Sequence, residues 1–556
     1  MKIAQLIKLR NLSVYSILFL LIVPSIIWAA LDQRVWPWDQ AWYAQVSVEL
    51  FYRLTHSPLE WFKDMVAAFG IKAPALSWFG QLFVPVGQFI GSIEVGLLLS
   101  IVLTQFIVLL IIFHIVLDLT SSRLISLVCS LFASSAPLSV ALSHQYLVEP
   151  LQTASVAWTM LIMVFSPQWK PRRILFHLVS AISLGMLAKV TYPLYAFGPI
   201  ITIVYYIFNK SFKERTLDKL SQKKVNIFSA ISPLYISTII LSSSFLLWYG
   251  KNFPAILSFS IQASSGEASL LYGEKAHFLY KLYYWLGAFQ KSFFAPITMF
   301  LIMGVLILAL AKSFYDFKKS NNSNNSVEFG YFDVVTVVSL SQIMLVIACF
   351  SFQVNQENRY LLPLLPYLCL VISWALKKVR QRLLTICVGF VIIFQLIIVQ
   401  SQALGFTSVS PELSYWLYPF DRNTIEKRTL SGLVDATCGN KVEENRYNVI
   451  GLELPWFNAN SATYFSSKHL LDRDFRCYYT SLGYAENDVE KAWQRLFDIN
   501  VNYFATLQLR SQVEATNPLN LVSLPILERI QGSTKFTREV FFYDQSRVLL
   551  YKKINL

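Results

Sequence analysis

About eleven apolar segments separated by short polar connections constrain this chain more than any other feature of its sequence. Crossing the hydrocarbon core of a bilayer as a helix takes about 20 mainly apolar residues, and most of the segments approach that length. The pattern therefore predicts a mainly α-helical, polytopic membrane protein with about 11 transmembrane helices. The predicted spans lie at about 12–31, 96–118, 124–142, 148–166, 174–188, 190–207, 227–249, 292–312, 332–352, 359–376 and 383–400.

The composition indicates the same class of protein. Of the 556 residues, 55% are hydrophobic and 14% are charged, whereas soluble domains carry about 25% charged residues. The formal net charge of +14 would suit a nucleic-acid partner, but the basic residues form short clusters between the apolar segments. Such clusters are typical of the cytoplasmic connections of membrane proteins. We therefore expect contact with membrane lipids and no nucleic acid.

The basic clusters also predict the orientation of the chain. With a cytoplasmic N-terminus, eleven spans place every cluster in the cytoplasm, and the alternate connections at 143–147 and 353–358 contain no Lys or Arg. The clusters lie at Arg123, 170–173, 210–224, 312–319 and 377–382. The basic clusters all fall on the cytoplasmic side only if the stretch at 174–207 contains an even number of spans, two or none. We predict two short spans there. We expect a multi-pass protein of the inner (plasma) membrane, whose first span is too long for a cleaved signal peptide.

Three large pieces of the chain then lie on the extracytoplasmic side, at 32–95, at 250–291 and after 401. The first of these loops carries an amphipathic pattern that predicts helices lying along the membrane surface. The sequence thus predicts a transmembrane module over 1–400 and an extracytoplasmic domain over 401–556.

The C-terminal piece is long enough for a small domain. Its patterns predict strands at 448–454 and 501–506 with a helix at 488–497 between them. A closing hairpin is predicted from strands at 539–543 and 547–551, with its turn at 544–546. This order of elements predicts a small α/β domain.

The cysteines divide between the two parts of the chain. Cys438 and Cys477 both fall in the predicted extracytoplasmic domain, where the compartment permits a disulfide; the sequence does not decide whether they pair. The remaining four cysteines fall in predicted spans, where a cysteine normally acts as a small buried hydrophobe. No Cys–His spacing indicates a structural metal.

The first extracytoplasmic loop opens with Trp36-Pro-Trp-Asp-Gln-Ala-Trp-Tyr-Ala-Gln45. The apolar spacing predicts an interfacial helix with Asp39 in its first turn, where the helix dipole favours an ionised carboxylate. Capping the helix is the simpler role for Asp39 taken alone. An ionised carboxylate at the membrane surface also has the property that a general base for a hydroxyl acceptor needs.

Four further charged residues fall at the extracytoplasmic ends of predicted spans or loops. Lys72 would be a phosphate partner or a snorkelling lysine, and Glu149, next to Pro150, would be a reactive carboxylate or a helix-start residue. Lys189 interrupts the apolar stretch at 174–207. Arg359 would pair with a lipid phosphate or anchor its helix in the headgroups.

Five short motifs in this order resemble the GT-C glycosyltransferases, most closely the protein mannosyltransferase and lipid A aminoarabinose transferase group (glycosyltransferase families 39 and 83). Asp39-Gln-Ala-Trp-Tyr-Ala is similar to the Asp-Glu-x-x-Tyr-Ala motif of their first loops, and Lys72-Ala-Pro-Ala-Leu-Ser-Trp78 to a Lys-Pro-Pro-x-x-x-Trp segment. The other three are Glu149-Pro-Leu, Gly185-Met-Leu-Ala-Lys-Val and Arg359-Tyr-Leu-Leu-Pro-Leu-Leu-Pro366. The similarity covers about 1–400 and, in kind, the C-terminal domain.

The resemblance implies a GT-C fold and an inverting transfer of a sugar from a polyprenyl-phosphate-linked donor to a lipid, glycan or protein acceptor. Asp39 and Glu149 would be the catalytic residues, as base and as the group that orients a hydroxyl. Lys72, Arg359 and Lys189 would bind the substrate through their charge. Trp42 and Tyr43 would border the sugar.

The chain departs from the family pattern at three positions. Gln40 stands in place of the second acid, Ala73 in place of the first proline, and Glu149 in place of an aspartate. These departures leave the acceptor type and the use of a divalent metal open, and no cofactor is assigned.

Two other classes of function compete with the transferase. A transporter or flippase of lipid-linked sugars would place charged groups near the middle of broken spans, whereas the candidates here gather near one face. A non-enzymatic scaffold with a sensing domain would need none of Asp39, Lys72 and Glu149. The sequence therefore favours the transferase.

Overall fold

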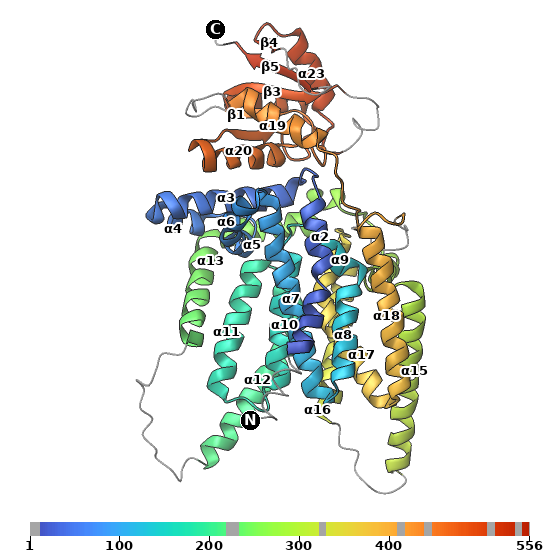
Figure 1. Ribbon diagram of the computed structural model, residues 1–556. Coiled ribbons are helices and arrows are strands. Elements are labelled where there is room, and N and C mark those ends of the chain that lie inside the picture. Colours follow the sequence, from blue (N-terminus) through green and yellow to red (C-terminus); the bar gives the residue numbers. More distant parts are fainter. Residues whose placement is uncertain are drawn as a thin grey trace. The chain divides into compact units, whose positions relative to one another are not determined.

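The structure is a computed structural model that describes residues 12–217, 233–321, 330–408, 417–438, 447–508, 518–539 and 548–554 (Figure 1). Contacts concentrate within two compact units that interleave along the chain. The first, here called the helical unit, comprises Met1–Ala29, Val66–Leu76 and Leu98–Pro419. The second, here called the α/β unit, comprises Ala30–Met65, Ser77–Leu97 and Phe420–Leu556.

A helix or helix pair occupies each of the apolar segments that the sequence predicts as spans. In chain order these elements are α2 (Val23–Leu31), α7 (Ile93–Thr120), α8 (Arg123–Ser135) with α9 (Pro137–Ser143), α10 (Glu149–Phe165), α11 (Pro171–Ala188), α12 (Tyr192–Leu217), α13 (Pro233–Ser265), α15 (Pro296–Asn321), α16 (Tyr331–Phe352), η4 (Asn358–Leu364) with α17 (Leu365–Val379), and α18 (Arg382–Ala403). The prediction of a mainly helical polytopic protein is confirmed.

Six helices within the described residues are long and apolar enough to cross a membrane, or seven if the bent pair α8–α9 is one span. The bend of 61° in that pair falls at Ala136, which precedes Pro137 and has a non-helical ψ of 125°. A residue before proline is sterically excluded from the helical region, so the break follows directly from the sequence. The count of about 11 spans and the sidedness of the loops remain predictions.

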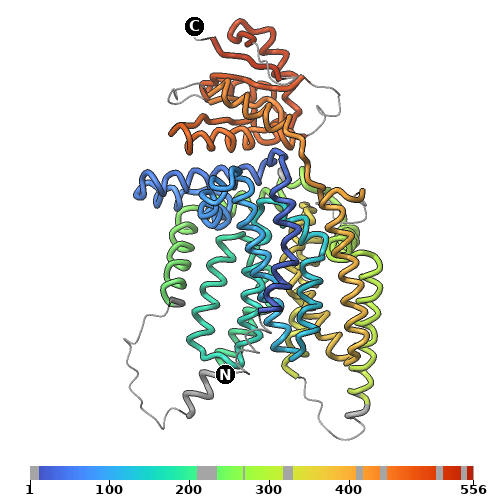
Figure 2. The backbone as a smooth tube through the Cα atoms, viewed as in Figure 1, coloured from blue at the N-terminus to red at the C-terminus, as the bar shows by residue number. Residues whose placement is uncertain are grey.

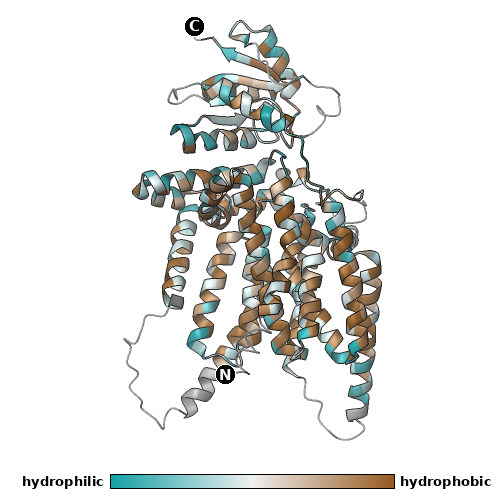
Figure 3. Cartoon of the chain, in the orientation of Figure 1, coloured by the Kyte–Doolittle hydropathy of each residue, from teal (hydrophilic) through white to brown (hydrophobic). Residues whose placement is uncertain are grey.

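The helical unit packs around α17. This helix contacts α8, α15 and α16, while α10 contacts α11, α12 and η4, and Figure 2 traces these helices running alongside one another. Buried aromatic side chains fill the interior, among them Phe132, Trp285 and Phe350. Large apolar side chains are exposed as well, for example Phe300, which is 71% exposed. Figure 3 shows that hydrophobic residues predominate along these helices. A helix that is apolar all round is typical of a membrane span.

One further helix of this unit, α14 (Phe278–Phe293), belongs to the predicted loop at 250–291 and packs against α9, α16 and η4. Its Lys281 Nζ donates to the carbonyl oxygen of Gln353 at 2.7 Å. Its Tyr284 hydroxyl donates to the carbonyl oxygen of Gln356 at 2.7 Å and to Asn358 Oδ1 at 2.8 Å. The helix thereby fixes the connection that leads into η4.

The α/β unit contains a five-stranded sheet of order β2-β1-β3-β5-β4. β1 (Tyr447–Ile450) pairs parallel with β2 (Tyr478–Ser481) and β3 (Val501–Leu507), and β5 (Val548–Lys553) pairs antiparallel with β3 and with β4 (Phe536–Glu539). The predicted small C-terminal α/β domain is confirmed. β4 includes Glu539, the first residue of the predicted first hairpin strand. The rest of that strand and the predicted turn at 544–546 lie outside the described residues.

The predicted helix at 488–497 is α21 (Val489–Asp498), and its start is encoded locally. Asp488 Oδ1 accepts hydrogen bonds from the backbone N–H groups of Glu490 and Lys491 at 2.9 and 3.1 Å, as N-cap residues do. The other helices of the domain were not predicted. They are α19 (Ile425–Cys438), α20 (Ala459–Arg473) and α23 (Ser523–Gly532).

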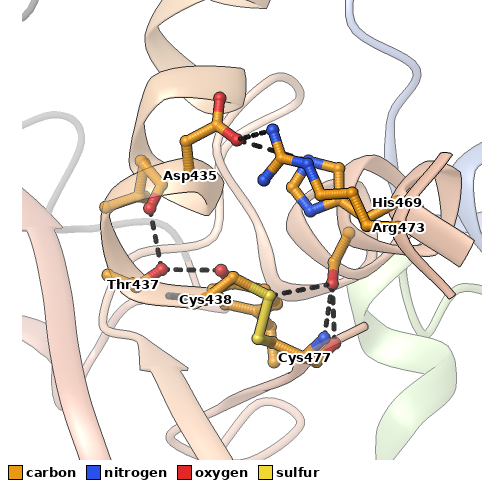
Figure 4. Close-up of a disulfide and its surroundings, with 9 residues drawn as sticks. Asp435, Thr437, Cys438, His469, Arg473 and Cys477 are labelled. Carbon is orange, nitrogen blue, oxygen red and sulfur yellow. Dashed lines mark hydrogen bonds and ion pairs between the residues drawn. A yellow bond between two sulfur atoms is a disulfide. The ribbon is translucent and has the colours of Figure 1, made fainter. Parts of the chain in front are cut away.

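A disulfide joins Cys438, at the end of α19, to Cys477, just before β2, with a Cα–Cα distance of 5.6 Å (Figure 4). Asp435 on α19 pairs with Arg473 at 3.0 Å and with His469 at 3.4 Å, both on α20. The disulfide that the sequence left undecided is therefore present. It links the end of α19 to the residue before β2, the edge strand of the sheet.

The helices of the first predicted loop are α3 (Trp38–His56), α4 (Pro58–Ala67), α5 (Ala75–Gly80), η1 (Gln81–Phe83) and α6 (Val84–Ile90). α3 packs against α20, and both belong to the α/β unit. The loop was predicted as part of the module over 1–400. Its residues 30–65 and 77–97 cluster with the C-terminal segment, and Val66–Leu76 clusters with the helical unit. Within α3, Tyr43, Val48 and Leu50 are buried.

A buried charge cluster as the candidate active site

Three of the predicted site residues meet in the helical unit. Glu149 is the first residue of α10, Lys189 ends α11, and Arg359 lies in η4. Lys189 Nζ donates to Glu149 Oε1 at 2.7 Å, and Arg359 Nε lies 3.6 Å from the same oxygen. Residues separated by 40 and 210 positions from Glu149 thus converge on one carboxylate oxygen.

Local sequence accounts for the position of each side chain. Pro150 follows Glu149 at the start of α10, where its missing N–H costs nothing. Lys189 has extended backbone angles, φ −161° and ψ 136°, which end α11 and free its side chain to turn toward α10. Tyr195 donates to the carbonyl oxygen of Tyr360 at 2.6 Å and so holds the start of η4 against α12.

The cluster is shielded from solvent. The side chain of Glu149 is 1% exposed, that of Arg359 12% and that of Lys189 19%. A carboxylate so deeply buried is costly unless cations and donors compensate it. Two cations on one carboxylate oxygen provide that compensation, so we interpret Glu149 as ionised.

Sequence reasoning missed two members of the cluster. Glu357 forms an ion pair with Arg359 Nε, and the ring of Tyr360 lies under Lys189, whose Nζ is 3.8 Å from the ring centroid. The signal was available in the run Gln356-Glu-Asn-Arg-Tyr360, which places an acid and an aromatic beside Arg359.

The second carboxylate oxygen of Glu149 is the chemically available atom. Within the part of the chain that the structure describes, Glu149 Oε2 is buried and has no hydrogen-bond partner. Buried polar atoms are normally satisfied. An acceptor in this state, next to two cations, is suited to receive a hydroxyl group of a ligand.

Lys72 belongs to the helical unit, in the segment Val66–Leu76, which hydrogen bonds connect to neighbouring elements. Trp248 Nε1 donates to the carbonyl oxygen of Ala68 at 3.0 Å, and the side-chain amide of Asn252 donates to that of Val66 at 3.2 Å. The hydroxyl of Tyr146, three residues before Glu149, donates to the carbonyl oxygen of Leu76 at 3.1 Å. The last bond ties the segment of Lys72 to the connection that leads into α10.

Asp39, Trp42 and Tyr43 lie together on α3 in the α/β unit. The N-cap of α3 is Pro37, and Asp39 occupies the first turn. In the first turn the helix dipole favours the ionised form of Asp39. Tyr43 is buried at 5% exposure, and Trp42 is half-buried.

The described residues contain no group of three or more His, Cys, Asp or Glu side chains that could hold a metal ion. In the charge cluster the two carboxylates already face two cations. No chemical step is assigned to a divalent metal.

No protein-family model matches this sequence, and no curated protein does. Among solved structures, ArnT from Cupriavidus metallidurans bound to undecaprenyl phosphate aligns over 96% of this chain and 98% of its own, with 11% identity and a TM-score of 0.53. The apo form of the same protein aligns over 98% of both chains, with 11% identity and a TM-score of 0.54.

The oligosaccharyltransferase AglB from Archaeoglobus fulgidus, in complex with an inhibitory peptide and a dolichol-phosphate, aligns over 94% of this chain and 72% of its own, with 9% identity and a TM-score of 0.54. These neighbours are GT-C proteins. The chain has the GT-C fold. At this level of identity the likeness concerns the fold, and the predicted GT-C architecture is confirmed.

Proposed function

We propose that this GT-C protein is a membrane glycosyltransferase that moves a sugar from a polyprenyl-phosphate-linked donor to a lipid, glycan or protein acceptor on the extracytoplasmic face. The observation that carries the proposal is the buried Glu149 between Lys189 and Arg359, with a free acceptor oxygen beside two cations. Neighbours of the same fold are seen with undecaprenyl phosphate and with a dolichol-phosphate, which supports a lipid-phosphate donor.

The cations suit the leaving group of such a reaction. When the sugar departs from the lipid phosphate, negative charge builds up on a phosphate oxygen, and fixed cations stabilise that charge. Arg359 presents planar N–H donors that match phosphate geometry. The ammonium group of Lys72 would add a second positive charge for the leaving phosphate. Lys189 keeps Glu149 ionised, so that Glu149 Oε2 can accept a hydrogen bond from a hydroxyl group of the sugar or the acceptor.

Asp39 is assigned as the base through its motif. In the proposed step the acceptor atom attacks the anomeric carbon while the bond from that carbon to the phosphate oxygen breaks. The acceptor proton passes to Asp39, and the polyprenyl phosphate leaves as an anion. One displacement inverts the anomeric carbon. Trp42 and Tyr43 contribute aromatic faces next to Asp39 on α3.

The test is transfer of label from a radiolabelled polyprenyl-phosphate sugar in membranes that contain the wild type or Asp39→Asn. Asp64→Asn is the matched control, since it removes an exposed carboxylate that pairs only superficially with Arg53 at 3.3 Å. We expect transfer with the wild type and the control and a loss of at least about 100-fold with Asp39→Asn, the scale of general-base catalysis.

The same membranes distinguish the competing function. A flippase would carry the lipid-linked sugar across the bilayer without forming a labelled product, and Asp39→Asn would leave that movement unchanged. Transfer by Asp39→Asn at the wild-type rate would remove Asp39 from the role of base, whereas movement without transfer would replace the transferase by a transporter.

A further inference from the structure

The residues directly before Asp39 are held by the C-terminal part of the α/β unit. Trp38 Nε1 donates to Glu453 Oε2 at 2.9 Å, and the side-chain amide of Asn460 donates to the carbonyl oxygen of Trp38 at 3.3 Å. The hydroxyl of Ser461 donates to the carbonyl oxygen of Trp36 at 2.7 Å. The start of α3 is therefore hydrogen-bonded to side chains of two neighbouring segments. These are the connection between β1 and α20, and the first turn of α20.

The ring of Trp36 adds an apolar contact to these bonds. It stacks on the ring of Tyr464 with 5.9 Å between centroids and 6° between planes, and both residues are buried. Tyr464 lies on α20, one turn after Ser461. Both tryptophans of the Trp36-Pro-Trp segment therefore have partners on the C-terminal side of the unit.

Glu453 is itself fixed in place. Its backbone N–H donates to Asn520 Oδ1 at 2.7 Å, and its carbonyl oxygen accepts from Asn520 Nδ2 at 3.1 Å. The backbone N–H of Ala459, at the start of α20, approaches Glu453 Oε1 at 3.5 Å. The carboxylate is therefore presented to Trp38 from a rigid backbone.

The Glu453 carboxyl group is surrounded by neutral hydrogen-bond donors. The described groups that face the Glu453 side chain are the Trp38 indole and the Ala459 N–H, and both are neutral donors. Burial raises the pKa of Glu453 to about 7, against the opposing effect of those two hydrogen bonds. A carboxylate without a cation costs folding free energy, so the side chain contributes here as a hydrogen-bond acceptor that holds the indole, a role that does not require the charge.

We propose that Glu453 is a positioning residue that sets the direction of the first turn of α3, and thereby of the Asp39 carboxylate, through its hydrogen bond to Trp38. The proposal rests on the proposed function of Asp39. It makes the C-terminal domain a part of the catalytic machinery, because the motif residue and the residue that orients it come from opposite ends of the chain.

Three variants of the full chain test the contact. Glu453→Ala removes the acceptor, Trp38→Phe removes the donor, and Glu453→Gln keeps an acceptor oxygen without the charge. Glu528→Ala, an exposed glutamate on α23, is the matched control. We expect Glu453→Ala and Trp38→Phe to lower kcat by about 10- to 100-fold, the scale of a misplaced reactive group, with the donor KM unchanged. Glu453→Gln should recover most of that loss.

A second readout does not depend on the reaction. Asp39→Cys places a thiol at the position of the base, and its alkylation rate by a maleimide reports the exposure and direction of that side chain. We expect Glu453→Ala to change the alkylation rate several-fold in this background and Glu453→Gln to restore it. Control reactions without Asp39→Cys correct for the native free cysteines.

The outcomes separate the two proposals. Absence of transfer by the wild type would refute the proposed function, while the alkylation rates would still decide whether Glu453 positions residue 39. An unchanged alkylation rate in Glu453→Ala would refute the positioning role even if transfer is observed. Equal losses of kcat and of folded protein in Glu453→Ala and Glu453→Gln would also refute it, because they would reduce Glu453 to a structural residue.

Discussion

Lys189 Nζ donates a hydrogen bond to Glu149 Oε1 at 2.7 Å and thereby links the end of α11 to the start of α10. The bond joins the end of one helix to the beginning of the next, and Arg359 approaches the same oxygen from η4. Three elements of the helical unit therefore depend on one carboxylate, so substitutions there affect both stability and activity.

Replacing Lys189 by methionine is expected to destabilise the protein. It leaves Glu149 buried with one cation in place of two, and breaking a buried ion pair costs about 3 to 5 kcal/mol. Thermal unfolding in detergent measures the loss. The double variant Lys189→Met with Glu149→Gln should recover part of the stability, because it removes the uncompensated charge, but it should not recover transfer. Additive losses in the two variants would show that the residues do not interact.

Glu149→Gln is expected to abolish transfer while the folded protein remains. Glutamine keeps the size of the side chain but weakens the acceptor of the proposed hydrogen bond from a hydroxyl group, and a loss on the order of 100-fold or more in kcat follows. Glu357→Gln is the control, since Glu357 faces Arg359 at 14% exposure and does not carry the available oxygen. Similar losses in both variants would assign Glu149 to charge balance alone.

Arg359→Lys and Lys72→Ala are expected to weaken use of the lipid-phosphate donor. Lysine keeps the charge of Arg359 but lacks the planar pair of donors that binds a phosphate in two places. The donor KM should rise by roughly 10-fold in each variant, about 1.4 kcal/mol, with the acceptor KM unchanged. A donor KM equal to that of the wild type would leave these side chains as anchors.

The stability of the α/β unit is expected to depend on pH through Glu453. Its pKa in the folded protein is about 7, above its ordinary value of 4.5, so the folded state binds the proton more tightly than the unfolded state. Stability is then greatest below pH about 4.5, falls as the pH rises toward 7, and is constant above that range. The fall should be on the order of 3 kcal/mol, from about 1.4 kcal/mol for each unit of pKa difference.

Comparing Glu453→Gln with the wild type over this range isolates the contribution of Glu453, since the variant lacks the titrating group. The difference in unfolding temperature between the two proteins should widen from pH 5 to pH 8 in favour of the variant. A constant difference would show that the carboxyl group titrates alike in the folded and unfolded states.

Reduction of the Cys438–Cys477 disulfide is expected to destabilise the C-terminal segment without direct loss of the charge cluster. The crosslink closes 39 positions of sequence, and loops of this size contribute about 3 to 4 kcal/mol through the unfolded state. Cys438→Ser with Cys477→Ser, compared with the wild type by limited proteolysis, measures the effect. Equal proteolysis rates would show that the sheet and its helices hold this segment unaided.

The apolar periodicity and the basic clusters determined most of the helical architecture. Each predicted segment contains a helix. The reason is that a membrane span requires about 20 apolar residues in one continuous stretch, which can be recognised in the sequence alone. The same holds for β1, β3 and α21, whose alternation and capping residues lie within the elements themselves. The motifs also indicated Glu149, Lys189 and Arg359 as candidate site residues, each as a separate charged residue near the end of a predicted span.

Only the tertiary structure decided which of these charges meet and what holds the first loop. Glu149 and Arg359 are 210 positions apart, and nothing in either local sequence states that α10 and η4 pack together. The grouping of α3 with α20, and the bond from Trp38 to Glu453, likewise join segments separated by about 400 residues. Long-range pairing depends on the packing of whole elements, whose free energy is spread over many side chains, so no single motif encodes it.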